Sequence, residues 1–277
     1  MFGELFLGEL LVNNFLQTFS SPLLDIFFKS ITYFGHPAFW ILICAWLFWL
    51  GKEKESFIII TIVTFSTMIA GFFKFIIARP RPSGLIVMET TPTQLSMPSG
   101  HSTLAGTIYS YFENKVFPKE RIFLFVLMIL TAISRLYLGV HYLSDVFVGL
   151  ILGYFIGKIV LKLDKKITKY EIKITKFREE KELLILFILA IILLAILPET
   201  FSLGYAILGY YFGFIVYRHK KMRMQNKLAG ILIGTICMGI IAFFAYTFTG
   251  LISIGLFFLL GAFITIIWPE ITPKLNI

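Results

Sequence analysis

The feature that most constrains the fold of this 277-residue chain is a series of long apolar stretches. Each is 16 to 23 residues long, close to the roughly 20 residues with which a helix crosses the hydrocarbon core of a bilayer. The mean hydropathy of +0.86 lies far above that of soluble domains. We therefore predict an all-α, polytopic membrane helix bundle with about nine transmembrane helices. The predicted spans are residues 36–51, 56–78, 102–117, 121–140, 142–162, 183–198, 202–217, 228–247 and 250–268.

Lysine and arginine residues gather in connections that lie on one side of the membrane in this arrangement. The connections comprise residues 51–56, 117–121, 162–182 and 218–227. The positive-inside rule places them in the cytoplasm. Topology thus explains the formal net charge of +9, and we expect no nucleic-acid partner. The segment 79–101 breaks the pattern with Arg79 and Arg81, so these two arginines need another explanation.

The long basic connection divides the chain. Residues 1–35 mix apolar and polar positions at helical spacing, which is typical of interfacial amphipathic helices. A transmembrane helix that begins near Leu5 is the alternative, and it would add a crossing. Residues 36–162 hold five predicted spans, residues 163–182 form a basic cytoplasmic loop, and residues 183–277 form a four-span region of unknown role.

Three ionisable residues stand out in the apolar stretch "SRLYLGVHYLSD". A helix over residues 121–162 would be about 60 Å long, so the chain must reverse, and Gly139 is the natural turning point. His141 and Asp145 then share a face of the first turns of the next helix, where the carboxylate can orient the imidazole. Arg135 adds a guanidinium suited to phosphate oxygens. An interfacial histidine beside an acidic cap is the simpler alternative.

Two further polar motifs lie at the same predicted membrane face. In "PSGH", Ser99 is a candidate N-cap, Gly100 allows close approach of an anion to the helix N-terminus, and His101 can donate a proton. In "KFIIARPRP", Lys74 precedes Arg81 by seven residues. Lys74 alone is also compatible with a lysine that extends toward the membrane surface.

Three cations at one point of a membrane repel each other unless an anion lies between them. Lys74, Arg81 and Arg135 all fall at predicted extracytoplasmic helix ends. We therefore predict that they converge with His101 and His141 on a phosphate group of a substrate.

These motifs resemble the signature of the phosphatidic acid phosphatase type 2 superfamily. The family patterns KxxxxxxRP, PSGH and SRxxxxxHxxxD are filled at every position, the last beginning at Ser134. The resemblance implies that His141 is the nucleophile that forms a phosphohistidine, that Asp145 orients it and that His101 protonates the leaving group. It also implies that no metal or other cofactor takes part. The phosphate-binding residues that it implies are Lys74, Arg81, Ser99, Gly100 and Arg135.

The resemblance implies that residues 36–162 are the catalytic core of a lipid phosphatase, although this family usually has six core spans. The expected substrate is a lipid phosphate or diphosphate: a polyprenyl diphosphate such as undecaprenyl diphosphate, phosphatidylglycerol phosphate or phosphatidic acid. We expect an integral protein of the plasma membrane with an extracytoplasmic active site. A phosphotransferase, and a transporter or other non-catalytic membrane protein, are the alternatives. The oligomeric state is not predicted.

Overall fold

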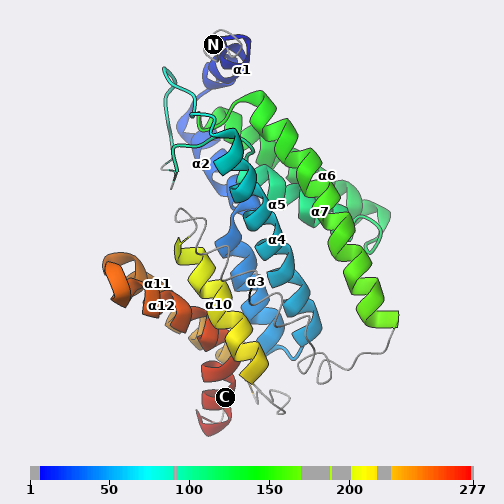
Figure 1. Ribbon diagram of the computed structural model, residues 1–277, viewed down its shortest axis with the longest axis vertical. Helices are drawn as coiled ribbons and strands as arrows, with labels where there is room; N and C mark the ends of the chain where they lie inside the picture. Colours follow the sequence, from blue (N-terminus) through cyan, green and yellow to red (C-terminus); the bar gives the residue numbers. More distant parts are fainter. Residues whose placement is uncertain are drawn as a thin grey trace. The chain divides into compact units, whose positions relative to one another are not determined.

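The computed structural model describes residues 7–89, 91, 93–169, 188, 201–216 and 226–275 (Figure 1). Within these ranges the regular structure is helical, apart from one isolated bridge between Pro80 and Leu95. The predicted all-α class is confirmed for this part of the chain. The helices are α1 (Leu7–Gln17), α2 (Pro22–Ile31), η1 (Thr32–Gly35), α3 (Pro37–Trp49), α4 (Glu53–Ile77), α5 (Gly100–Phe112), α6 (Pro118–Tyr137), α7 (Leu143–Lys169), α10 (Phe201–Val216), α11 (Lys227–Thr247), α12 (Gly250–Ala262), η3 (Phe263–Ile267), α13 (Trp268–Ile271) and η4 (Thr272–Leu275).

The chain forms two compact units. The first comprises residues 1–39 and 65–163, and the second comprises residues 40–64 and 164–277. All motif residues of the sequence analysis belong to the first unit. Residues 40–64 belong to the same unit as the C-terminal part of the chain, whereas the predicted domains group them with residues 65–162.

The predicted count of nine transmembrane helices is not confirmed. Among the described residues, four helices are long and apolar enough to cross a membrane, and a fifth span arises if two helices that meet at a 58° bend form one broken crossing. The four are Glu53–Ile77, Leu143–Lys165, Lys227–Thr247 and Gly250–Leu275, and the bent pair is Pro22–Gly35 with Pro37–Trp49. The predicted span 183–198 and most of the two long basic connections lie outside the described residues.

Two predicted spans in the first unit do not meet the requirements of a membrane-crossing helix, for different physical reasons. Helix α5 has 13 residues, so it is only about 20 Å long against a hydrocarbon core of about 30 Å. Helix α6 has 20 residues, but it carries four charged side chains, three of them in its first turn. In the second unit, helix α10 is apolar, but its 16 residues are also fewer than a crossing of the hydrocarbon core needs.

Local sequence signals set several helix ends in the first unit. Ser21 caps α2 by accepting a hydrogen bond from Leu24 N, with Pro22 at the first helical position. The helical structure is therefore interrupted between α1 and α2, and it resumes at Pro22. Gly139 has φ +73°, and a Cβ there would lie 2.5 Å from Ile86 O. Only glycine fits this turn between α6 and α7, and the predicted reversal at Gly139 is confirmed.

A row of glycines brings α7 against α5. Gly149, Gly153 and Gly157 recur every four residues on one face of α7. A Cβ at Gly149 would lie 2.7 Å from Ser99 O, and a Cβ at Gly157 would lie 2.5 Å from Thr107 O. The missing side chains thus permit close backbone approach, as in other membrane helix pairs. The N-terminus of α5 is thereby held beside the start of α7.

The second unit has a core of aromatic side chains, several of which form hydrogen bonds. Trp49 Nε1 donates to Ile264 O at 3.0 Å, and its ring lies 6.0 Å from that of Trp268. Ser56 Oγ and Tyr210 OH are 2.7 Å apart. These buried contacts join α3 to η3 and α13, and they join α4 to α10.

Candidate active site

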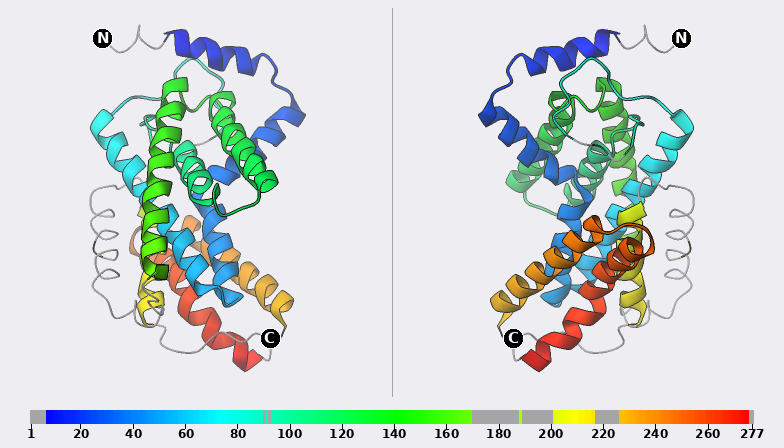
Figure 2. Two further views of the ribbon diagram at one scale, coloured as in Figure 1. Left: turned by 90° about the vertical axis from the view of Figure 1, so that its right-hand side faces the viewer. Right: turned by 90° about the vertical axis from the view of Figure 1, so that its left-hand side faces the viewer.

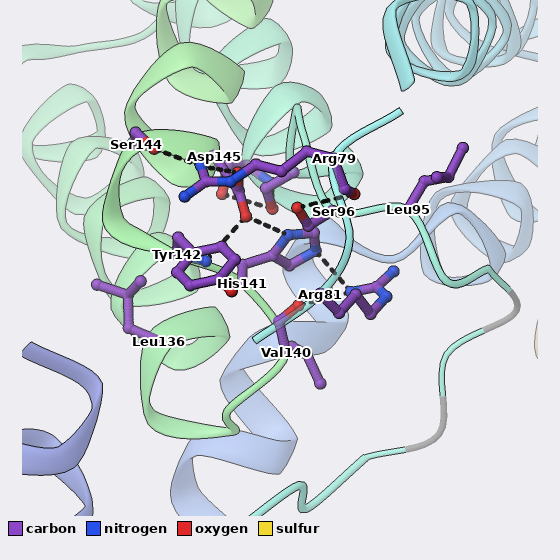
Figure 3. A network of polar contacts seen from close by, with 12 residues as sticks. Arg79, Arg81, Leu95, Ser96, Leu136, Val140, His141, Tyr142, Ser144 and Asp145 are labelled. Atoms are coloured by element: carbon purple, nitrogen blue, oxygen red, sulfur yellow. Dashed lines mark hydrogen bonds and ion pairs between the residues drawn. The ribbon is translucent and has the colours of Figure 1, made fainter. Parts of the chain in front are cut away.

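His141 lies in the turn between α6 and α7, with 2% of its surface exposed. Helix α7 begins at Leu143, so His141 precedes the helix, and its prediction on the first turns of α7 was wrong by about half a turn. The pairing with Asp145 remains, because His141 Nδ1 and Asp145 Oδ2 are 3.4 Å apart. The backbone N–H of Tyr142 donates to the same carboxylate oxygen at 2.8 Å. Figure 3 shows this carboxylate facing the imidazole ring.

The second imidazole nitrogen faces a different partner. Arg81 Nη1 lies 3.3 Å from His141 Nε2. A guanidinium has no acceptor, so Nε2 must accept and the proton of a neutral ring must sit on Nδ1, toward Asp145. Arg81 is itself fixed by Val140 O and Thr93 O, each at 2.7 Å. The ring is therefore held with its unprotonated nitrogen beside a cation (Figure 3).

The other two predicted cations lie near enough to His141 for their charges to act on it. Lys74, in the last turn of α4, donates to Leu95 O at 2.8 Å and to Ser96 O at 3.0 Å. Arg135, in the last turn of α6, forms a 2.5 Å ion pair with Glu89.

The charges act together on the histidines. Burial sets the pKa of His141 well below the usual 6.5, and the charges of Lys74, Arg81 and Arg135 lower it further. The pKa of His101 is also lowered well below 6.5, first by burial and then by Arg135. Both imidazoles are therefore neutral near pH 7, and a dianionic phosphate among these cations would raise both pKa values. The structure thus brings the predicted cations and both histidines to one place.

The "PSGH" motif forms the N-terminus of α5. Ser99 Oγ caps the helix by accepting from Ser102 N, as predicted, and Ser99 N donates to Asp145 O at 3.0 Å. A Cβ at Gly100 would meet no atom within 4 Å, so there is open space beside the Cα of Gly100 at this helix end. His101 Nε2 is buried and has no hydrogen-bond partner among the described residues. Helix dipole and amide groups favour an anion at this position.

The contacts of Arg79 were not predicted from the sequence. Arg79 Nη1 donates to Asp145 Oδ1 at 2.6 Å, and Arg79 Nη2 pairs with Glu9 at 3.3 Å. Its departure from the positive-inside pattern was the only available signal. Glu89 and Asn13 were also missed, because nothing in their local sequence indicates contacts with residues 46 or 128 positions away.

Fold and site together define a helical membrane protein that gathers buried cations around an oriented histidine. The family model of the PAP2 superfamily matches residues 55–169, which include all three motifs. Phosphatidylglycerophosphatase B from Bacillus subtilis (strain 168) is 30% identical over 167 residues, which cover 55% of this chain and 81% of that protein. Lipid A 1-phosphatase from Rhizobium etli is 30% identical over 151 residues, 45% of this chain and 65% of that protein.

A solved structure is also similar to this chain, over 58% of its length. The crystal structure of Aquifex aeolicus LpxE superposes with a TM-score of 0.51 at 29% identity, covering 58% of this chain and 99% of that one. The chain therefore belongs to the PAP2 superfamily. It is an enzyme of the phosphoric ester hydrolase class and an integral membrane protein.

Proposed function

We propose that this protein is a metal-independent lipid phosphatase that works through a phosphohistidine at the extracytoplasmic face of the plasma membrane. The observation that carries the proposal is the arrangement of His141, whose Nδ1 faces Asp145 and whose Nε2 lies 3.3 Å from Arg81. A neutral imidazole with one oriented nitrogen and a cation at the other is suited to attack a phosphorus atom whose oxygens the cations bind.

In the first step, the lone pair of His141 Nε2 attacks the phosphorus atom and forms a P–N bond. The P–O bond to the lipid breaks, and its electron pair leaves with the lipid oxygen. His101 supplies the proton that this oxygen takes up. Because the bound phosphate offsets the surrounding positive charge, it raises the pKa of His101 and so favours the protonated acid.

In the second step, neutral His101 removes a proton from a water molecule, whose oxygen attacks the phosphohistidine. The P–N bond breaks, its electron pair returns to His141 Nε2, and inorganic phosphate leaves. Lys74, Arg81, Arg135 and the amide group of Gly100 at the start of α5 stabilise the charge on the phosphoryl oxygens in both steps.

The position of the site in the helices supports a lipid substrate. Lys74 lies in the last turn of α4 and Asp145 in the first turn of α7, and both helices are long and apolar enough to cross a membrane. A phosphate bound there would lie at a membrane surface with its lipid chains beside apolar helices. The distribution of Lys and Arg in the sequence supports an extracytoplasmic position for that surface.

A panel of lipid phosphates tests the function. Purified protein in detergent is given phosphatidylglycerol phosphate, phosphatidic acid, undecaprenyl diphosphate and glucose 6-phosphate, with inorganic phosphate as the readout. We expect phosphate release from at least one lipid, without an added acceptor, and little from the soluble sugar phosphate. Phosphate release that needs an acceptor hydroxyl would indicate a phosphotransferase instead, and no turnover of any lipid would contradict the proposal.

Removal of divalent metal provides a second prediction. The cations and amides of the site take the place that Mg²⁺ has in many phosphoryl-transfer enzymes. We expect the initial rate of phosphate release to stay within about twofold of the untreated rate after dialysis against EDTA, since a metal needed for charge stabilisation would contribute several kcal/mol. Loss of activity that added Mg²⁺ restores would show that the metal-free mechanism is wrong.

A further inference from the structure

Helix α1 carries three polar side chains at intervals of four residues. Glu9, Asn13 and Gln17 therefore lie on one face of the helix. This face meets the turn between α6 and α7 that carries His141, and α1 lies across that end of the two helices (Figure 2). The family model begins at residue 55, so α1 lies outside the matched segment.

Asn13 makes the central contact. Its side chain is fully buried, and its amide nitrogen donates to Leu136 O and to His141 O, both at 2.9 Å. Each hydrogen of the amide is thus committed to one carbonyl. The first carbonyl belongs to the last turn of α6, where helix carbonyls lack partners within the helix. The second belongs to the proposed nucleophile itself. Asn13 therefore ties the main chain of His141 to the end of α6.

Glu9 holds the other side of the turn. Its carboxylate accepts from Ser144 N at 2.9 Å and pairs with Arg79 at 3.3 Å. Arg79 in turn binds Asp145 at 2.6 Å. A chain of charged groups thus runs from α1 through Arg79 to the carboxylate that faces the imidazole. Since Arg79 and Asp145 are both buried, these contacts are poorly screened by solvent.

Gln17, at the C-terminal end of α1, contacts the residues that precede the turn. Its amide nitrogen donates to Tyr137 O at 3.0 Å and to Ile86 O at 2.7 Å. The same nitrogen would lie 3.0 Å from a Cβ at Gly139. The apolar residues Val12 and Leu16 pack beside these groups in the cluster that contains Leu136. Polar and apolar contacts of α1 therefore converge on the turn.

We propose that α1 is a positioning element of the active site and that Asn13 is a positioning residue that fixes the main chain of His141. The inference rests on the proposed role of His141 as nucleophile. Asn13 does not touch the substrate. It sets where Nε2 stands relative to Asp145 and Arg81, and a displacement of about 1 Å at a reacting atom can lower a rate by about 100-fold.

The test compares Asn13→Ala with Asn14→Ala in the full-length protein. Asn14 is the neighbouring residue of the same type, and its side chain is exposed. We expect kcat for the best lipid substrate to fall about 10- to 100-fold in Asn13→Ala, with KM changed less than about threefold. In Asn14→Ala both constants should equal those of the wild type.

Two inhibitors distinguish a displaced His141 from a general loss of the phosphate-binding site. Orthovanadate takes a fifth ligand as phosphorus does in the transition state, so its affinity depends on the position of His141 Nε2. Inorganic phosphate needs only the cations and amides. We expect the Ki of orthovanadate to rise about tenfold in Asn13→Ala while the Ki of phosphate stays within about twofold. An unchanged kcat would overturn the proposal, and so would an equal weakening of both inhibitors.

A substitute variant and a comparison with His141→Ala distinguish the possible outcomes of this test. If Asn13→Ala does not purify as a folded protein, Gln17→Ala takes its place with the same readouts, because its side chain is less buried and holds the same turn. An inactive wild type would contradict the proposed function. An active wild type, an inactive His141→Ala and a fully active Asn13→Ala would contradict only the role of α1.

Discussion

Replacement of His141 by alanine is expected to abolish phosphate release while the protein still inserts and purifies. The imidazole supplies the electron pair for the P–N bond, and its two nitrogens face Asp145 and Arg81. Loss of an enzyme's nucleophile typically lowers kcat by about 10⁴- to 10⁶-fold. The readout is inorganic phosphate from the best lipid of the panel.

Exogenous imidazole provides the control for this variant. The substitution removes a buried ring and leaves a space beside the cations. Free imidazole that enters this space can attack the phosphorus atom in place of the side chain. Partial recovery of lipid dephosphorylation would show that the rest of the site is intact. Full activity of His141→Ala without imidazole would remove the nucleophile assignment.

The second large effect is expected for Asp145→Asn. In the wild type, Asp145 Oδ2 accepts from Tyr142 N and faces His141 Nδ1, while Oδ1 accepts from Arg79. In the variant, the amide oxygen can serve only one of these sides. If it faces Arg79, the amide nitrogen faces Nδ1 and favours the tautomer whose proton is on Nε2, where the lone pair is needed. We expect kcat to fall by roughly 10³- to 10⁴-fold with KM little changed.

Asp164→Asn is the matched control for this prediction. Asp164 lies further along α7 and pairs with Lys54 at 3.1 Å. The same change of charge on the same helix should leave kcat within about twofold, because Asp164 lies 19 residues, or about 28 Å, further along α7 than Asp145. Equal activity of Asp145→Asn and wild type would show that the carboxylate serves only as a helix cap.

The parts of the site that were predicted correctly depend on residues that lie close together in the sequence. The turn at Gly139 follows from the length of the apolar stretch and from the need for a positive φ. The cap at Ser99 and the pairing of His141 with Asp145 follow from spacings of three and four residues. Short-range geometry of this kind is fixed by the backbone, so a sequence pattern suffices.

The parts that sequence did not predict depend on contacts between distant segments. Glu9 reaches Arg79 across 70 positions, and Glu89 reaches Arg135 across 46. Their charges looked like ordinary features of an interfacial helix and a loop. The approach of α5 to α7 was also missed, although the repeat of Gly149, Gly153 and Gly157 is visible in the sequence.

The expected spans show where hydropathy alone is insufficient. Helix α4 and the apolar part of α7 match their predicted ranges within a few residues. Helices α5 and α6 do not qualify as apolar spans, although both contribute site residues: His101 at the start of α5 and Arg135 near the end of α6. A stretch such as α5 can be apolar because it is buried in protein, and hydropathy does not separate this case from contact with lipid.

Trapping of the phosphoryl group is the most direct test of the central claim. Wild-type protein is mixed with a lipid substrate labelled in the scissile phosphate, quenched in base within one turnover, and digested for peptide mapping. We predict that the label lies on His141 through a P–N bond, which is stable in base and labile in acid, and that Asp145→Asn accumulates it more slowly. Label on any other residue, or turnover with no labelled protein at any time, would contradict the account.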